Sequence, residues 1–197
     1  MIFPISKSCY KIVNHVYNNN GTKISKLLRE ASVSQRIGYQ HIDELIKLGI
    51  FKEECNGSLR IIKPDFSKET GRLLFGLIEK EKELNLIEKK PTIKDSLINL
   101  TSESSNLGIK TALLFGPFIK DHGKEKIDIL VISEGDSKRI LLFLQDCFSN
   151  IENAVSARIV SLDGFTKLKN NKNDLFQAFF KNHICVYNTQ SFLKIID

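Results

Sequence analysis

Two neighbouring runs in the C-terminal half of the chain combine residues that could take part in metal or phosphate chemistry. Residues 113–121 read LLFGPFIKD, and residues 127–131 read IDILV. Asp128 offers hard carboxylate oxygens, whereas Lys120 and Lys126 offer ammonium groups. A site for two Mg²⁺ ions needs several oxygen ligands, and a lysine in the first shell would repel the metals. These residue types therefore indicate a poor two-metal site.

The same two runs resemble the signature of the DNA polymerase β-type nucleotidyltransferases. In that family a strand ends in Gly-Ser, a short helix follows, and the next strand carries Asp-x-Asp. The resemblance implies that the glycine admits a triphosphate and that the carboxylates bind two Mg²⁺ ions. Gly116 and Asp128 match this pattern, but Pro117 stands at the serine position and Lys126 at the first aspartate. The resemblance therefore implies a nucleotidyltransferase-like domain with part of its chemistry removed.

The third carboxylate of the family is also replaced. Members read Val-Asp-Leu-Val on a strand that we place at residues 154–162, where this chain has Arg158. We therefore expect no metal site and no catalytic residue, unless a shifted register brings in Asp121, Glu125 or Asp163. A retained pocket could still hold nucleotide phosphates with cations in place of Mg²⁺, and ordinary solvated lysines are the alternative. The residues of that tentative nucleotide site are Gly116, Lys120, Lys126 and Arg158.

The N-terminal third of the chain shows the pattern of three helices and a β-hairpin. Apolar spacing predicts a helix over about residues 7–18, a second one capped by Thr22, and a third one from Ser34 to Gly49. The third helix is expected to direct five apolar residues towards a core: Ile37, Ile42, Leu45, Ile46 and Leu48. Two alternating runs joined at Asn56-Gly57 predict the hairpin.

This order of elements resembles the winged helix-turn-helix regulators of bacteria and archaea over about residues 5–64. The resemblance implies that the third helix enters the major groove of DNA and that the wing touches the neighbouring backbone. Glutamine and arginine can pair with base edges, while serine and tyrosine can reach phosphate oxygens. The alternative is that these polar faces serve protein contacts. The residues expected at the DNA are Lys23, Lys26, Ser34, Gln35, Arg36, Tyr39, Gln40 and Arg60.

The positive charge of the chain lies in the same third. Residues 1–68 contain 11 Lys/Arg against 6 Asp/Glu, a net charge of +5, and residues 69–197 contain 18 against 17, a net charge of +1. These numbers sum to the 29 basic and 23 acidic residues of the whole chain. A basic module with the rest of the chain near neutrality is typical of phosphate binding.

Residues 66–107 are expected to connect the two parts. A helix is predicted over residues 66–87, followed by a second helix and a Ser-rich segment, residues 101–106, as the linker. The long helix could pair two copies of the chain, as two-fold related DNA half-sites require, or it could pack on its own domains. No apolar run approaches the length that spans a bilayer, and the four cysteines show neither zinc nor disulfide spacing.

These patterns predict an α+β protein with a winged helix at residues 1–65, a connecting helix and linker at 66–107, and an α/β domain with a mixed sheet at 108–197. We expect a cytoplasmic transcriptional regulator that binds double-stranded DNA as a homodimer and needs no cofactor. Its C-terminal domain would supply oligomerisation or ligand sensing. The alternative is an active, Mg²⁺-dependent nucleotidyltransferase that uses Asp128, so the question of enzymatic activity stays open, with inactivity favoured.

Overall fold

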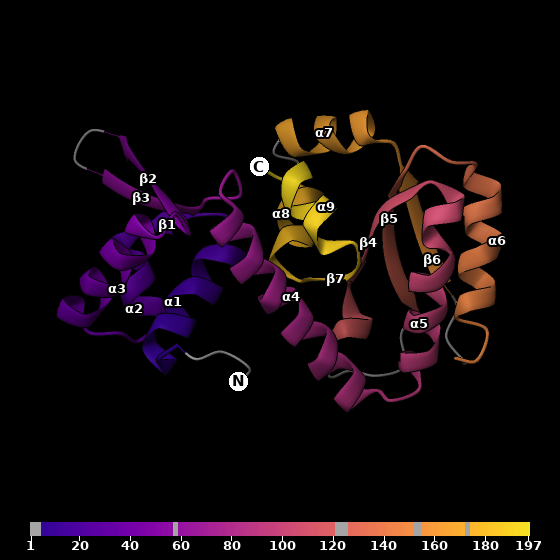
Figure 1. Ribbon diagram of the computed structural model, residues 1–197, viewed down its shortest axis with the longest axis horizontal. Helices are drawn as coiled ribbons and strands as arrows, with labels where there is room; N and C mark the ends of the chain where they lie inside the picture. The colour runs from indigo at the N-terminus through magenta and orange to yellow at the C-terminus, as the bar shows by residue number, and fades with distance from the viewer. Residues whose placement is uncertain (1–4, 57–58, 121–125, 152–154, 172–173) are drawn as a thin grey trace. The chain divides into compact units, whose positions relative to one another are not determined.

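Helix α4 (Glu69–Lys89) contains the boundary between the two units of the protein, which we call the first and the second unit (Figure 1). The computed structural model describes residues 5–56, 59–120, 126–151, 155–171 and 174–197. The first unit extends to residue 78 and includes residue 197, and the second covers residues 79–196. The fold is α+β, with a small antiparallel sheet in one unit and a mixed sheet in the other, as predicted.

The first unit contains the predicted three helices and hairpin. Its elements are α1 (Lys7–Asn18), β1 (Thr22–Lys23), α2 (Ile24–Glu30), α3 (Gln35–Lys47), β2 (Phe51–Asn56) and β3 (Leu59–Pro64). The turn expected at Asn56-Gly57 falls partly outside the described residues, and Asn56 itself pairs with Leu59. Thr22 was expected to cap the second helix, but it pairs with Ile62 in the small sheet, so Lys23 occupies the cap position.

The core of the first unit forms around the apolar stripe predicted on α1. Four of its residues, Ile12, Val13, Val16 and Tyr17, are completely buried. The Tyr17 ring stacks on Phe75 with 5.0 Å between ring centroids, and Phe66 meets the Phe75 ring edge-on at 5.3 Å. Because buried aromatic rings contribute large apolar areas, this cluster fixes α1 against the start of α4.

The third helix buries fewer residues than its sequence predicted. Ile42 and Leu45 are buried, but Ile37 is 46% exposed and Leu48 is 60% exposed, so the prediction was wrong for these two. The face that packs inward contains Gly38, where an added Cβ would lie 2.1 Å from Leu28 Cδ2. Since α2 and α3 approach each other at this glycine, the neighbouring position 37 turns about 100° away, towards solvent.

The second unit is built on a four-stranded sheet with the order β6-β5-β4-β7. Its strands are β4 (Ile109–Phe115), β5 (Ile127–Ser133), β6 (Val155–Val160) and β7 (His183–Tyr187). Strand β5 runs parallel to β6 and antiparallel to β4, and β4 also runs antiparallel to β7. The sheet is therefore mixed, as predicted, and the bounds of β4 and β7 match the predicted strands at both ends.

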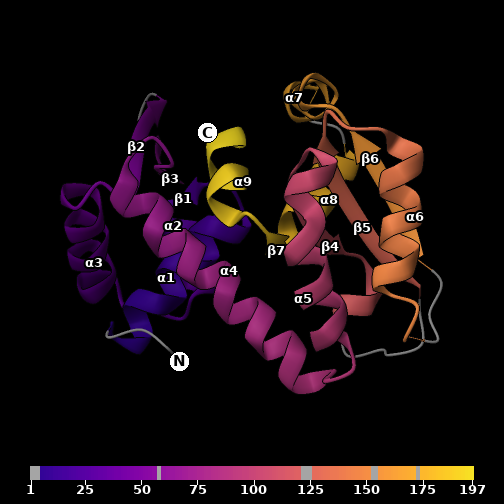
Figure 2. The same ribbon diagram turned by 45° about the vertical axis from the view of Figure 1, so that its right-hand side comes forward.

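Helices cover both faces of this sheet (Figures 1 and 2). They are α5 (Ile93–Glu103), α6 (Ser137–Cys147), α7 (Leu162–Asn170), α8 (Asp174–Lys181) and α9 (Thr189–Ile195), with 3₁₀ turns η1 (Ser104–Leu107) and η2 (Pro117–Ile119). The main core lies between the sheet and α5 and α6, where Leu97, Leu100, Ile129, Ile140 and Leu144 pack together. Helices α8 and α9 lie on the other side of the sheet. No helix within the described ranges is both long enough and apolar enough to span a bilayer.

The Ser-rich segment is part of the second unit and not a linker between units. Ser104 is completely buried and its hydroxyl donates a hydrogen bond to the Leu100 carbonyl at 2.5 Å. The polar composition misled the prediction because a serine hydroxyl can be satisfied within its own helix. The N-cap of α7 is Ser161, whose hydroxyl accepts a hydrogen bond from the Gly164 amide at 3.1 Å.

A buried carboxylate joins α4 to β7 within the second unit. Glu79 Oε2 accepts a hydrogen bond from the Cys185 amide at 2.6 Å, and its Oε1 lies 2.7 Å from Lys82 Nζ and 3.5 Å from His183 Nε2. Burial alone would raise the pKa of Glu79, but Lys82, His183 and the Cys185 amide together lower it. Burial lowers the pKa of His183 to about 4, despite the attraction of Glu79. The carboxylate is therefore charged and the imidazole neutral at pH 7.

Candidate functional site

The N-terminus of α3 is open to a ligand. Ser34 occupies the cap position with extended backbone, and its side chain makes no capping hydrogen bond. The first turn contains no acidic residue, and Gln35 and Arg36 are exposed there. The amides of a helix N-terminus that lack a side-chain cap attract anions, because they carry unsatisfied donors and the positive end of the helix dipole.

Two shallow hollows flank this helix end and contain three cations that sequence analysis did not select. The first hollow, of about 320 Å³, includes Arg29, and the second, of about 380 Å³, includes Lys7 and Lys11. Ser34 lines both hollows. None of the three cations forms an ion pair with another described residue. Lys7 and Lys11 are four residues apart on the polar side of the first helix. That spacing was the signal in the sequence that could have identified these two lysines.

The remaining predicted residues of α3 lie farther along the same exposed side. Tyr39 is 40% exposed and lines the first hollow together with Gln35. Gln40 is exposed and donates a hydrogen bond to Glu44 Oε1 at 3.2 Å. The structure therefore brings Ser34, Gln35 and Tyr39 to one surface. The side chain of Gln40 is hydrogen-bonded to Glu44 instead.

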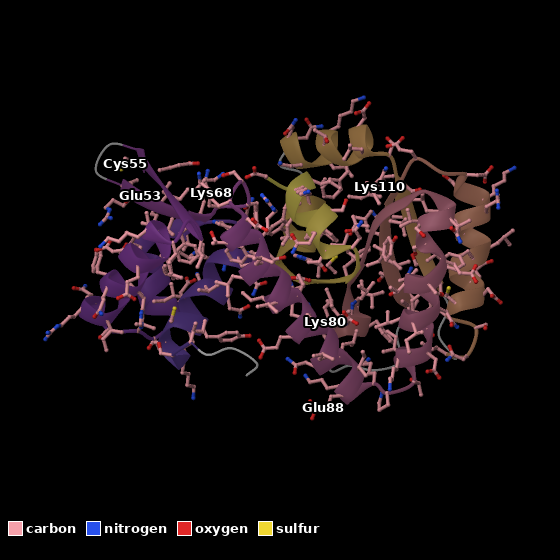
Figure 3. All side chains as sticks on the ribbon, in the orientation of Figure 1. Glu53, Cys55, Lys68, Lys80, Glu88 and Lys110 are labelled. Carbon is pink, nitrogen blue, oxygen red and sulfur yellow. The ribbon has the colours of Figure 1, made fainter. Side chains whose placement is uncertain are left out.

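Arg60, the predicted wing residue, is held by acidic neighbours. Its guanidinium donates through Nε and Nη2 to the two carboxylate oxygens of Glu53, and Nη2 lies 4.0 Å from Asp43 Oδ1. Figure 3 shows Glu53 on β2, the strand that pairs with that of Arg60. The hydrogen bond from Arg60 lowers the pKa of Glu53. The charge of Arg60 is thus partly neutralised in the absence of a ligand.

The two other predicted cations do not line either hollow. Lys23 is exposed on β1, where it pairs with Ile61 of β3. Lys26 is exposed on α2 and lies 3.8 Å from Glu30, one helical turn further on. An exposed pair of this kind contributes little to stability and is easily exchanged for a phosphate contact.

The Gly116 turn of the second unit places its glycine against Asp128. Phe115, the last residue of β4, pairs with Asp128 in β5. Gly116 has a φ of +78°, and a Cβ there would lie 2.6 Å from Asp128 Oδ2. The turn therefore requires glycine both for its backbone conformation and for the space that the carboxylate fills.

The cations expected around this turn do not all gather there. Lys120 follows η2 and Lys126 precedes β5, and both are exposed. Arg158 pairs with Leu130, two residues beyond Asp128 on the same face of β5. No group of three His, Cys, Asp or Glu side chains with metal-site geometry occurs among the described residues. Asp163 is exposed on α7, and Asp121 and Glu125 lie outside the described residues.

An apolar cavity of about 170 Å³ lies on this face of the sheet, below α7 and α8. Its lining is made of Phe115, Leu130, Arg158, Val160, Phe165, Leu168, Phe176 and Phe179. The cavity has no signal in the sequence, because four of its lining residues are phenylalanines, which are typical of an ordinary core. Residues from three strands and two helices contribute, so only the tertiary structure brings them together.

The cysteines offer little nucleophilic chemistry. All four are free, and Cys9, Cys147 and Cys185 are buried. Burial raises the pKa of Cys147 to about 11 and that of Cys185 to about 12, so these thiols stay protonated at neutral pH. Cys55 is exposed on β2 (Figure 3), where its thiol donates a hydrogen bond to Glu53 Oε1 at 3.8 Å.

Comparison with known proteins adds no further assignment. No protein-family model, curated protein or solved structure matches the chain. The protein has two candidate sites: the surface around the N-terminus of α3, and the face of the mixed sheet that carries Asp128 and Arg158.

Proposed function

We propose that the protein is a cytoplasmic, winged-helix transcriptional regulator that binds double-stranded DNA through α3. The observation that supports this most is the uncapped N-terminus of α3, flanked by two hollows that contain Lys7, Lys11 and Arg29. Phosphates bound at these cations would hold the helix in register along a duplex. Gln35 and Arg36, on the first turn, would then face base edges in the major groove.

The charges around α3 favour DNA binding over protein contact. A protein-binding surface of this size is normally depleted of charged residues at its centre and enriched in buried aromatic anchors. Here Tyr39 is the one aromatic residue among those lining the two hollows, while serine hydroxyls and unpaired cations predominate. Hydroxyls and cations are the common partners of phosphate oxygens, so the composition favours nucleic acid.

A homodimer is part of the proposal. Leu73 and Leu77 lie one turn apart on α4 and are 54% and 50% exposed. Exposed leucines at helical spacing form the usual seam when two helices pair, and a two-fold pair of winged helices would read two half-sites. In this scheme the second unit is a degenerate nucleotidyltransferase-like domain that has lost catalysis and that supports assembly or ligand binding.

The test is the salt dependence of binding to duplex DNA, measured by fluorescence anisotropy with labelled genomic fragments. We expect affinity to fall steeply with salt, because bound cations displace counterions from the phosphates. Changing Gln35 and Arg36 to alanine together should lower affinity or remove sequence preference. The matched control changes Arg139 and Gln145, an exposed pair of the same types on α6. Equal affinities of the two double variants would contradict the proposal.

An active nucleotidyltransferase is the second candidate, and one observation favours it. Gly116 and Asp128, the two residues that match the family's pattern, lie next to each other at the end of β4. Incubation with labelled ATP, CTP or GTP and Mg²⁺ would reveal transfer, and Asp128→Ala should abolish it. Transfer that depends on Asp128 would show that other oxygen ligands complete the metal site. Absence of transfer would support a domain that has lost its catalytic activity.

A further inference from the structure

We propose that the apolar cavity beneath α7 and α8 binds a small aromatic carboxylic acid, with the ring among the phenylalanines and the carboxylate on Arg158. This site lies outside the DNA surface of the first unit, and it uses Arg158, which the resemblance placed at a nucleotide site, for a carboxylate in place of phosphates. Its lining contains one charged side chain, that of Arg158, and seven apolar ones.

The size of the cavity fits a single aromatic ring. Its volume is about 170 Å³, and cavities of roughly 150 Å³ with a Leu, Ile and Phe lining are known to bind benzene. A benzoate-sized molecule therefore fills the space, whereas the base and ribose of a nucleotide together exceed it. The apolar walls would also leave the ribose hydroxyls without hydrogen-bond partners, which is costly in a buried site.

The phenylalanine rings that line the cavity form two edge-to-face pairs. Phe115 and Phe179 meet with 5.7 Å between centroids at an interplanar angle of 78°, and Phe165 and Phe176 meet at 5.7 Å and 65°. A ligand ring between these pairs can make the same edge-to-face contacts, which are favourable beyond their apolar area. An aromatic body is thus preferred over a flexible chain of equal volume.

Arg158 supplies the selectivity for an acid. Its side chain is exposed on β6, and it forms no ion pair with any described residue. A guanidinium presents parallel N–H donors that match the two oxygens of a carboxylate. Because the cation stands beside apolar walls, a bound carboxylate is shielded on one side from water, and the pair is stronger than at an open surface.

Methyl-resolved NMR of the full chain tests this proposal, with benzoate as the probe and benzamide as its uncharged counterpart. We expect saturable shifts at the methyl groups of Leu130, Val160 and Leu168, and none at Leu142, which is 65% exposed on α6. For a ligand of nine heavy atoms, the expected Kd is on the order of 1 mM. Benzamide should bind about tenfold more weakly, because it cannot pair with the guanidinium charge.

Two variants distinguish the contribution of the ligand's ring to binding from that of its carboxylate. Arg158→Gln should weaken benzoate binding about tenfold and leave benzamide unchanged, since only the acid uses the charge. Leu168→Phe should fill the cavity and abolish binding of both. Arg139→Gln on α6 is the matched control and should change neither.

The proposal is overturned if benzoate causes no saturable shift in the wild-type chain, or if it shifts Leu142 as strongly as Leu168. It is also overturned if benzamide and benzoate bind equally, a comparison that needs no variant to fold. DNA plays no part in these measurements, so their failure would leave the regulator proposal standing.

Discussion

The carboxylate of Asp128 occupies the space that a side chain on Gly116 would need, with Oδ2 lying 2.6 Å from where a Cβ would be. The two residues belong to adjacent strands of the sheet and define its Gly116 turn. A phosphate could approach the glycine backbone only beside a negative charge. A phosphate at this turn would therefore need a cation between it and Asp128.

Gly116→Ala should destabilise the second unit by about 2–3 kcal/mol, because a φ of +78° is strained for alanine and the new Cβ collides with Asp128. Chemical denaturation measures the free energy of unfolding. In an Asp128→Ala background the same change should cost less, since the collision is gone. Gly164→Ala, in the ordinary backbone of α7, is the control and should be nearly neutral. Equal costs in both backgrounds would show that the two residues do not interact.

Lys7 and Lys11 should act on DNA affinity without changing sequence preference. Replacing both with alanine should weaken binding to all duplexes alike and reduce the slope of log K against log salt by about 2, one for each lost phosphate contact. Anisotropy titrations at several salt concentrations measure this slope. Lys94 and Lys138, exposed lysines of the second unit, provide the matched pair. An unchanged slope would mean that the second hollow, which contains both lysines, is not part of the DNA surface.

Glu53→Gln should strengthen DNA binding at low salt. The change releases Arg60 from its two-oxygen partner, and the freed guanidinium can then reach a phosphate from the hairpin. We expect a gain of several-fold in affinity and a salt slope that is steeper by about 1. Glu54→Gln, which removes the exposed partner of Lys63, tests whether any lost carboxylate has the same effect. Weaker binding by the Glu53 variant would mean that the ion pair positions Arg60 for DNA.

The stability of the second unit should fall as pH decreases from 6.5 to about 4. His183 is neutral in the folded state because burial lowers its pKa to about 4, so protons bind the unfolded chain first. The loss over this interval should approach about 3 kcal/mol. The pKa of Glu79 is also lowered, so its contribution is lost at still lower pH. Urea denaturation across this range measures the slope.

His183→Gln provides the comparison for this pH dependence. The variant should show a shallower decline between pH 6.5 and 4, whatever its stability at pH 7. A decline as steep as that of the wild type would mean that another group binds the protons.

The sequence allowed the regular elements to be predicted well where one local pattern dominated. The bounds of β4 and β7 followed from short, mainly apolar runs, and the buried stripe of α1 followed from its period. The errors arose where tertiary contacts decided. Thr22 looks like a helix cap until β3 is present to pair with it, and Ile37 looks like core until Gly38 lets α2 approach.

The candidate sites were predictable to different degrees. Ser34, Gln35 and Tyr39 were expected together because they occupy one helix, and the structure places them on one exposed surface. Lys7 and Arg29 belong to other helices, and no local pattern connects them to α3. The cavity beside Arg158 depends on residues from β4 to α8, which are far apart in the chain. Such a site has no signature in a single sequence.

The contact between Glu79 and the Cys185 amide has a consequence for self-association. Strand β7 is a border of the sheet, and its outward amides would otherwise be available to a strand from another molecule. The buried carboxylate takes up one of these donors and keeps α4 over that border. Addition of a foreign strand there must first displace a charged group from a dry environment, which makes β-sheet extension, and the aggregation that follows from it, unfavourable on this side.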